Sequence, residues 1–410
     1  MSKLTTHVFQ NGMPAAFVAL PDSRVNTAIL IVGAGTRFET LETQGLARFY
    51  ANICFQGSKD YASKDQLWNA IDALGLTIKP AVYPEYCLYY FSSSPQVFND
   101  SLSLFMNIFF QPALTQAGLE AEKQLTKSEI ELTSKNPQLI SLNTLTSLIF
   151  NQSSLGFDAM GSDQGLTNID LSALQDFKSK YYGSQNCLLL VLGPDKNFAL
   201  ESLEGIIKTV PQGPRLDPPP FDLTQTKIVQ EKINQPGSYS NITLGSLCFG
   251  RNSDKRIIQN ILLNILSEGR KNQRLKTLQE NKLVSFIKPW IKTFSDCGLL
   301  LIQAACQTTN EQQVLLELKS QLSNLQQSSI TQEELDKAKL YYTNKLLNGL
   351  SNSLELGLFY SLSYFFSLNE QTPEEIINIV KNCTLEEIND LAKTIFKPEA
   401  LSWVTVGPGY

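Results

Sequence analysis

Residues Thr43–Ser58, TQGLARFYANICFQGS, decide how the rest of the chain is interpreted. Apolar side chains recur along this stretch at the spacing i, i+3, i+4, i+7 and i+8: Leu46, Phe49, Tyr50, Ile53 and Cys54. That spacing predicts an amphipathic helix with one buried face. Arg48, Ala51 and Asn52 form a second set on the same turns, with the spacing i, i+3, i+4.

The composition is that of an ordinary globular protein. A length of 410 residues predicts two to three domains. The net charge of −5, without a basic block, argues against nucleic acid as a partner. No apolar run approaches the roughly 20 residues that span a bilayer, and the first residues lack the apolar core of a signal peptide. We therefore expect a cytoplasmic protein as the sequence stands, or a periplasmic or organellar one if a targeting segment was removed.

Several catalytic chemistries are excluded by the residues that the chain lacks. His7 is the single histidine, so the chain cannot contain a two-histidine zinc motif. Any histidine-dependent catalytic triad would have to use His7 itself. The sequence contains no G-x-S-x-G elbow and no glycine-rich phosphate loop. The seven cysteines are scattered without a C-x-x-C pair, which favours reduced thiols.

The predicted elements alternate between short strands and longer helices. An Asn11-Gly12 turn predicts a hairpin over residues 5–20, and Val25–Gly33 is a β-branched strand. The remaining predictions are helices at 63–74, 95–109, 116–133, 139–150 and 171–182, and strands at 76–82, 86–92 and 187–192. Antiparallel ribbons with helices on one face favour an α+β fold over a doubly wound sheet.

The second half of the chain repeats the first. Pro194 ends LVLGP and Pro408 ends VTVGP, 214 residues later. Three further pairs recur at offsets of 209, 216 and 214: Ile78-Lys79-Pro80 with Ile287-Lys288-Pro289, Thr115-Gln116 with Thr331-Gln332, and Asp170-Leu171 with Thr384-Leu385. These offsets predict two copies of one α+β unit. A proline-rich stretch separates the copies, so we expect a first domain at 1–208, a linker at 209–226 and a second domain at 227–410.

Residues Thr43–Ser58 and the segment before them resemble the zinc helix of the M16 (pitrilysin-type, inverzincin) metallopeptidases. Gly33–Arg37, Gly45–Ala47 and Phe55–Ser58 stand where that family has a strand ending in A-G-S/T-R, then G-L-A, and a phenylalanine with G-T/S. Between them the family has H-x-x-E-H. Here Arg48, Ala51 and Asn52 replace the first histidine, the glutamate and the second histidine.

The resemblance implies a fold and a site. The fold would be two homologous α/β-sandwich domains, each an antiparallel-rich sheet with helices packed on one face, that together form a half-clamshell. Glu122 and Glu129 match the family's pair of acids, and Glu129 takes the place of the distal zinc ligand. Because catalytic zinc sites use three protein ligands, we expect neither bound metal nor another cofactor, and no catalytic residue. Glu129 is then either the salt-bridge partner of Arg48 or part of a ligand-binding site.

The family adds substrate peptide to an edge strand, which the resemblance places at Leu76–Val82. Pro80 lies inside this strand and has no N–H to offer an added strand. Pro80 would therefore interrupt peptide binding, or simply protect an exposed edge from aggregation.

Three functions remain open. The chain could be a non-catalytic subunit that pairs with a zinc-bearing M16 chain, or with itself, to form or regulate a peptide-degrading chamber. It could instead be a structural subunit of a larger complex, as the core proteins of respiratory complexes are. A stand-alone peptide-binding protein is the third possibility, for which the aromatic run from Tyr83 to Phe91 could serve, although such a run is also typical of a sheet core.

Overall fold

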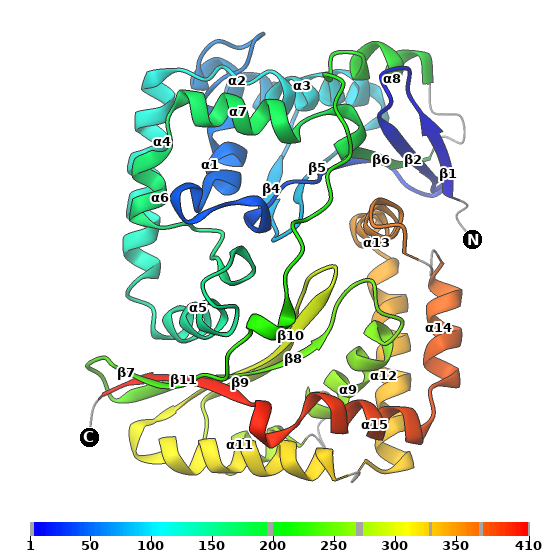
Figure 1. Cartoon of the computed structure of the whole chain (residues 1–410). Coiled ribbons are helices and arrows are strands. Elements are labelled where there is room, and N and C mark those ends of the chain that lie inside the picture. The colour runs from blue at the N-terminus through cyan, green and yellow to red at the C-terminus, as the bar shows by residue number, and fades with distance from the viewer. Residues whose placement is uncertain (1–3, 195–199, 268–273, 328–329, 369–371, 409–410) are drawn as a thin grey trace. The chain divides into compact units, whose positions relative to one another are not determined.

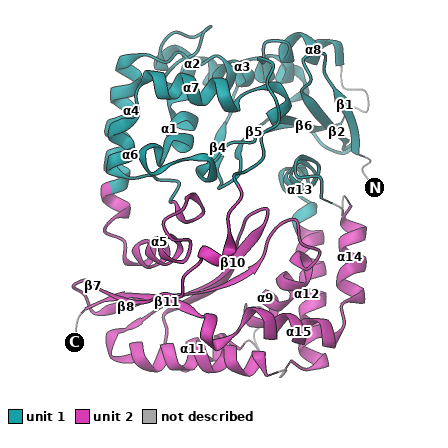
Figure 2. Cartoon of the chain, in the orientation of Figure 1, with its two compact units in different colours: residues 1–130, 158–219, 349–371 teal, residues 131–157, 220–348, 372–410 magenta. Residues whose placement is uncertain are grey.

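The protein is an α+β structure built from two mixed β-sheets and helices (Figure 1). The computed structural model describes residues 4–194, 200–267, 274–327, 330–368 and 372–408. These residues form two compact units, one from 1–130, 158–219 and 349–371 and the other from 131–157, 220–348 and 372–410 (Figure 2). No helix among the described residues is both long and apolar enough to cross a membrane.

The first unit is organised around a six-stranded sheet with the order β1-β2-β6-β3-β5-β4. All neighbouring pairs are antiparallel except β2 and β6, which run parallel. Its strands are β1 (Leu4–Val8), β2 (Pro14–Ala19), β3 (Asn26–Val32), β4 (Lys79–Val82), β5 (Cys87–Ser93) and β6 (Cys187–Gly193). Its helices are α1 (Leu46–Ile53), α2 (Lys64–Ala73), α3 (Phe98–Phe110), α4 (Gln116–Thr133), α6 (Asp163–Asn168), α7 (Leu171–Tyr181), α8 (Leu200–Ile207) and α13 (Ser353–Phe365).

The second unit has a five-stranded sheet with the order β7-β11-β8-β10-β9, in which only β7 and β11 run parallel. Its strands are β7 (Gln230–Asn234), β8 (Tyr239–Phe249), β9 (Phe286–Thr293), β10 (Cys297–Gln307) and β11 (Ser402–Gly407). Its helices are α5 (Pro137–Ile149), α9 (Arg256–Ser267), α10 (Lys276–Glu280), α11 (Glu311–Gln326), α12 (Gln332–Leu350), α14 (Pro373–Asn382) and α15 (Leu385–Ile395).

The two sheets share one topology, which confirms the internal repeat. The series β2-β6-β3-β5-β4 corresponds strand by strand to β7-β11-β8-β10-β9, with the same parallel pair at the start. The sheet of the first unit adds β1, for which the described residues provide no counterpart in the second unit. Asn136 and Asn352, 216 residues apart, cap the N-termini of the matching helices α5 and α13.

The prediction that helices cover only one face of each sheet is wrong. In the first unit α13 packs on the face that carries Ile29, Ile31 and Leu190, opposite the main core. In the second unit α5 packs on the face that carries Val404 and Val406. The physical reason is that both faces of these sheets are apolar, so each needs a cover.

The compact units also differ from the domains expected from the chain order, 1–208 and 227–410. Residues 131–157, with α5, belong to the second unit, and residues 349–371, with α13, belong to the first. Within the expected linker at 209–226, the regular structure is a single 3-10 turn at Leu223–Gln225. The repeats therefore exchange one helix each, and their cores are not contiguous in sequence.

Candidate functional site

Helix α1 positions the three residues singled out in the sequence. The predicted apolar stripe is buried in the first unit's core, and Ala51 is buried with it. Arg48, Asn52 and Gln56 are spaced four residues apart, so they share one face of α1 and the turn that follows it, away from the apolar stripe. Arg48 and Gln56 both bond to carboxylates of α4, the long helix at Gln116–Thr133.

Arg48 and Glu129 form a salt bridge, which confirms their predicted approach. Arg48 Nη2 donates to Glu129 Oε2 at 2.8 Å, and the two side chains are 22% and 46% exposed. The second terminal nitrogen, Nη1, is buried, and no hydrogen bond reaches it within the described part of the chain. The pair is thus partly open to water, where ion pairs contribute about 1 kcal/mol or less.

Glu122 is the second acid on α4 and is almost fully buried. Gln56 Nε2 donates to its Oε2 at 3.2 Å. Burial raises the pKa of this carboxyl, while the amides of Gln56 and Asn52 and the charge of Arg48 oppose that rise. A polar cluster of three α1-side residues and two acids therefore links α1 to α4.

Glu39 supports the start of α1, a role that the sequence analysis missed. Its Oε2 accepts the Gly45 N–H at 2.9 Å and its Oε1 accepts the Ala47 N–H at 2.8 Å. Gly45 has φ of +94° and lies against Gly161, so no other residue fits there without strain. The carboxylate thus caps the first turn of the helix, where the helix dipole favours negative charge.

The burial of Glu39 predicts a pH-dependent stability. Burial raises its pKa to about 7 despite the two backbone hydrogen bonds. The folded protein then holds a proton that the unfolded chain releases, so the free energy of unfolding falls as pH rises from about 4.5 to about 7. A shift of this size corresponds to about 3 kcal/mol.

Urea unfolding at pH 5 and pH 8 measures this effect. The unaltered protein should lose about 2.5 kcal/mol of unfolding free energy between the two pH values through Glu39. The Glu39→Gln variant cannot ionise at this position and should not show this loss. Glu131→Gln, at an exposed position, serves as the control and should follow the unaltered protein. Parallel pH profiles for all three proteins would contradict the assignment to Glu39.

Arg37 and Glu85 form a second buried link, also missed from sequence. Arg37 Nη1 lies 2.6 Å from Glu85 Oε1, and the side chains are 1% and 0% exposed. The Arg37 Nε donates to the Pro219 carbonyl at 3.0 Å. Gly35 allows this approach, because a Cβ there would lie 2.1 Å from the Tyr83 carbonyl oxygen. The G-A-G-T-R segment before α1 is therefore fixed to the β4–β5 turn.

The aromatic run after β4 is largely core. Tyr86, Tyr89 and Phe91 are buried, and the Tyr89 hydroxyl lies 2.6 Å from that of Tyr182. Tyr90 is partly buried. Tyr83 is exposed at 41%, and its ring stacks on that of Tyr86 at a centroid distance of 4.6 Å. The core interpretation of this run therefore holds for most of it.

Two family models match most of the chain. The family model described as "Insulinase (Peptidase family M16)" matches residues 16–163, and the one described as "Peptidase M16 inactive domain" matches residues 168–342. The chain belongs to the M16 peptidase family. This confirms the family expected from the sequence.

Relatives and solved structures agree with the assignment. An uncharacterized zinc protease of Bacillus subtilis, YmxG, is 22% identical over 396 residues, which cover 94% of each chain. Subunit beta of the mitochondrial-processing peptidase of Saccharomyces cerevisiae is 20% identical, over 98% of this chain and 90% of its own. The structure described as the peptidase M16 inactive domain from Pseudomonas fluorescens has a TM-score of 0.90 at 17% identity and covers 100% of this chain and 98% of its own. A chain of complex III from Candida albicans has a TM-score of 0.79 at 16% identity, over 98% and 95%.

The side chains at the positions that the sequence resemblance assigns to the zinc motif do not fit a zinc ion. Ala51 offers no donor atom and Asn52 offers a neutral amide, while Glu129 Oε2 already accepts from the Arg48 guanidinium. A fixed cation beside a dication is repulsive at the low dielectric of a partly buried site. Among the described residues, no three His, Cys, Asp or Glu side chains lie together as a metal would require.

Strand β4, where the sequence resemblance places the family's substrate strand, lies at the edge of the first unit's sheet. The Tyr83 N–H donates to the Tyr86 carbonyl and so points toward β5. Because the backbone groups of successive residues point to opposite sides of a strand, the nitrogen of Pro80, three residues earlier, points away from β5. Pro80 therefore removes an N–H at the place where an added strand would need it. Pro289 occupies the same outward position on β9, the matching edge strand of the second unit.

Proposed function

We propose that this chain is a catalytically inactive M16 subunit that pairs with a zinc-bearing M16 chain to form or regulate a peptide-degrading chamber. One observation carries the proposal: the three positions of the family's H-x-x-E-H motif hold Arg48, Ala51 and Asn52, and Arg48 binds the remaining acid, Glu129. The ion pair takes over the role of connecting α1 to α4 without offering a site for water activation, which needs a bound metal and a base.

The outward-facing Pro80 supports the same proposal. A peptide added to β4 would lose one hydrogen bond in the middle of a four-residue strand. The chain thus departs from its active relatives in the alignment of substrate as well as in the metal site. We infer that cleavage takes place on the partner.

The proposal is tested on the purified chain. Plasma mass spectrometry should find far less than one zinc per chain after dialysis, and a quenched-peptide assay should detect no cleavage. A zinc-bearing M16 relative from the same source, purified in parallel, serves as the positive control. Mixing the two should raise the sedimentation coefficient and change the relative's turnover. One zinc per chain, or cleavage by the chain alone, would overturn the proposal.

A structural role in a larger complex is the second candidate. It is favoured by the likeness to the complex III chain, which spans 98% of this protein. The sedimentation experiment separates the two functions, because a structural subunit would leave the turnover of the zinc-bearing relative unchanged. Peptide binding by the isolated chain, without association, would instead favour the stand-alone binding protein.

A further inference from the structure

Strand β7 forms an open edge of the second unit's sheet. The Trp403 N–H donates to the Val229 carbonyl and the Gln235 N–H donates to the Gly407 carbonyl, each at 2.8 Å. Because backbone groups alternate along a strand, the N–H and C=O groups of Gln230, Lys232 and Asn234 point away from β11. Within the described part of the chain no strand pairs with this side of β7.

The internal repeat shows what covers the corresponding edge in the first unit. There β2 corresponds to β7, and β1 pairs antiparallel with it, setting His7 opposite Ala15 and Thr5 opposite Phe17. The registers of the two parallel pairs make Ala15 and Ala19 equivalent to Gln230 and Asn234. The same architecture therefore carries a sixth strand in one unit, and the described residues leave its place open in the other.

The open edge also differs from the opposite edges of the two sheets. Those edges carry Pro80 and Pro289, whose nitrogens face outward and block an added strand. Residues 230–234, QEKIN, include no proline. The edge of β7 is thus chemically able to accept a strand where the other two are blocked.

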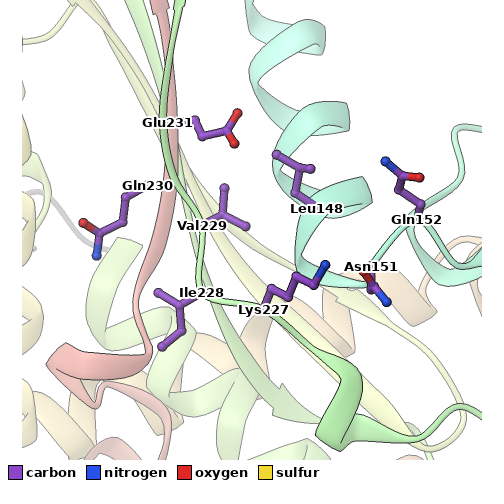
Figure 3. A pocket seen from close by; sticks show the side chains of 8 residues that line it. All are labelled: Leu148, Asn151, Gln152, Lys227, Ile228, Val229, Gln230 and Glu231. Carbon is purple, nitrogen blue, oxygen red and sulfur yellow. The ribbon is translucent and has the colours of Figure 1, made fainter.

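Hollows flank β7 on both faces of the sheet. The first, of about 590 Å³, lies between β7 and the end of α5 and is lined by Leu148, Asn151, Gln152 and residues 227–231. Figure 3 shows Glu231 on the side of α5 and Gln230 on the opposite side of the strand. The second, of about 370 Å³, includes Gln230, Leu316 and Trp403, with the Lys319 ammonium 3.3 Å from the centre of the Trp403 ring. Alternate side chains of an added strand would point toward these two hollows.

Helix α5 and the residues just before it hold the two flanks of β7 in place. The Lys227 N–H donates to the Ile149 carbonyl at 2.9 Å, and the Gln235 side chain donates to the Lys135 carbonyl at 3.3 Å. Lys232 Nζ also lies 3.0 Å from Glu311 Oε1 on α11. Because the strand is fixed before anything binds, an added segment need not order it.

We propose that β7 is a docking edge for an extended segment of a partner protein, which runs antiparallel to it and carries apolar and threonine side chains as β1 does. A second copy of β7 fits poorly in each of the three central registers. A two-fold axis centred on Glu231 or Lys232 would set like charges opposite each other. An axis centred on Ile233 would set Pro236, which has no N–H, opposite Gln230. The proposal does not depend on the zinc position, which belongs to the other compact unit.

The test uses the full chain and a capped peptide with the β1 sequence, residues 3–10, KLTTHVFQ. Bound peptide should slow amide hydrogen exchange at residues 230–234. Lys232→Pro removes one outward N–H, whereas Lys232→Ala keeps it, and both variants lose the ion pair with Glu311. Peptide affinity, measured by fluorescence anisotropy, should be about tenfold weaker for Lys232→Pro than for Lys232→Ala.

Several outcomes would overturn the docking edge. They are equal affinity of the two variants, protection confined to residues 14–19, and no protection at all. Self-association of the unaltered chain that protects residues 230–234 would assign the edge to a second copy and overturn the partner segment. If Lys232→Pro unfolds, the pair Asn234→Pro and Asn234→Ala provides the same comparison at the next outward residue.

Discussion

Replacing Glu85 by glutamine is expected to lower the free energy of unfolding by about 3–5 kcal/mol, because the variant leaves the buried Arg37 guanidinium without the facing carboxylate charge. Glu129→Gln removes the partner of Arg48 in the same way but at a half-exposed position, and should cost about 1 kcal/mol or less. Urea unfolding at pH 7 measures both. The two variants are matched in chemistry and differ in burial.

A combined variant checks the origin of the Glu85 effect. Arg37→Met with Glu85→Leu removes both charges and keeps apolar volume, so it should be more stable than Glu85→Gln alone. Equal losses for Glu85→Gln and Glu129→Gln would contradict the assignment, because burial would then not govern the cost. A combined variant less stable than the single one would also contradict it.

Restoring the zinc motif with Arg48→His, Ala51→Glu and Asn52→His should create a metal site without creating a good peptidase. The substitutions supply two imidazoles and release Glu129 from Arg48, which completes the three-ligand set of an M16 site. We expect zinc affinity to rise about a thousandfold or more over the unaltered chain. Turnover should stay far below that of an intact relative, because catalysis requires substrate placed to within about 1 Å and Pro80 interrupts the strand that aligns it.

Two further variants separate metal binding from substrate alignment. Adding Glu129→Gln to the triple variant should abolish zinc binding, as seen by plasma mass spectrometry after dialysis. Adding Pro80→Val should raise turnover, because it restores the outward N–H of β4. Turnover by the triple variant alone at the level of an intact relative would refute the role given to Pro80.

Periodic features of the sequence predicted much of the fold. Helix α4 begins at Gln116 and ends at Thr133 as expected, and the repeat offsets anticipated the matching topology of the sheets. The approach of Arg48 to Glu129 was also predictable, since the M16 resemblance placed both at one site. In each case a local pattern or a family motif carried the information.

Long-range pairs were not predictable in the same way. Arg37 and Glu85 are 48 positions apart in the sequence. Glu39 accepts hydrogen bonds from backbone N–H groups, which every residue except proline has, so no residue pattern indicates these contacts. The exchange of α5 and α13 leaves only a weak signal in the sequence. Both helices have apolar residues around most of their circumference, which is typical of a helix enclosed on several sides.

The exchange of α5 and α13 has a consequence for synthesis on the ribosome. The strands of the first sheet are complete at Gly193, whereas the helix that covers their second face begins at Ser353. At roughly 5–20 residues per second, that face waits for about 8–30 s before its cover is made. Ile29, Ile31 and Leu190 lie on it. The nascent first half therefore exposes this apolar face to water until the residues of α13, Ser353–Phe365, have been synthesised.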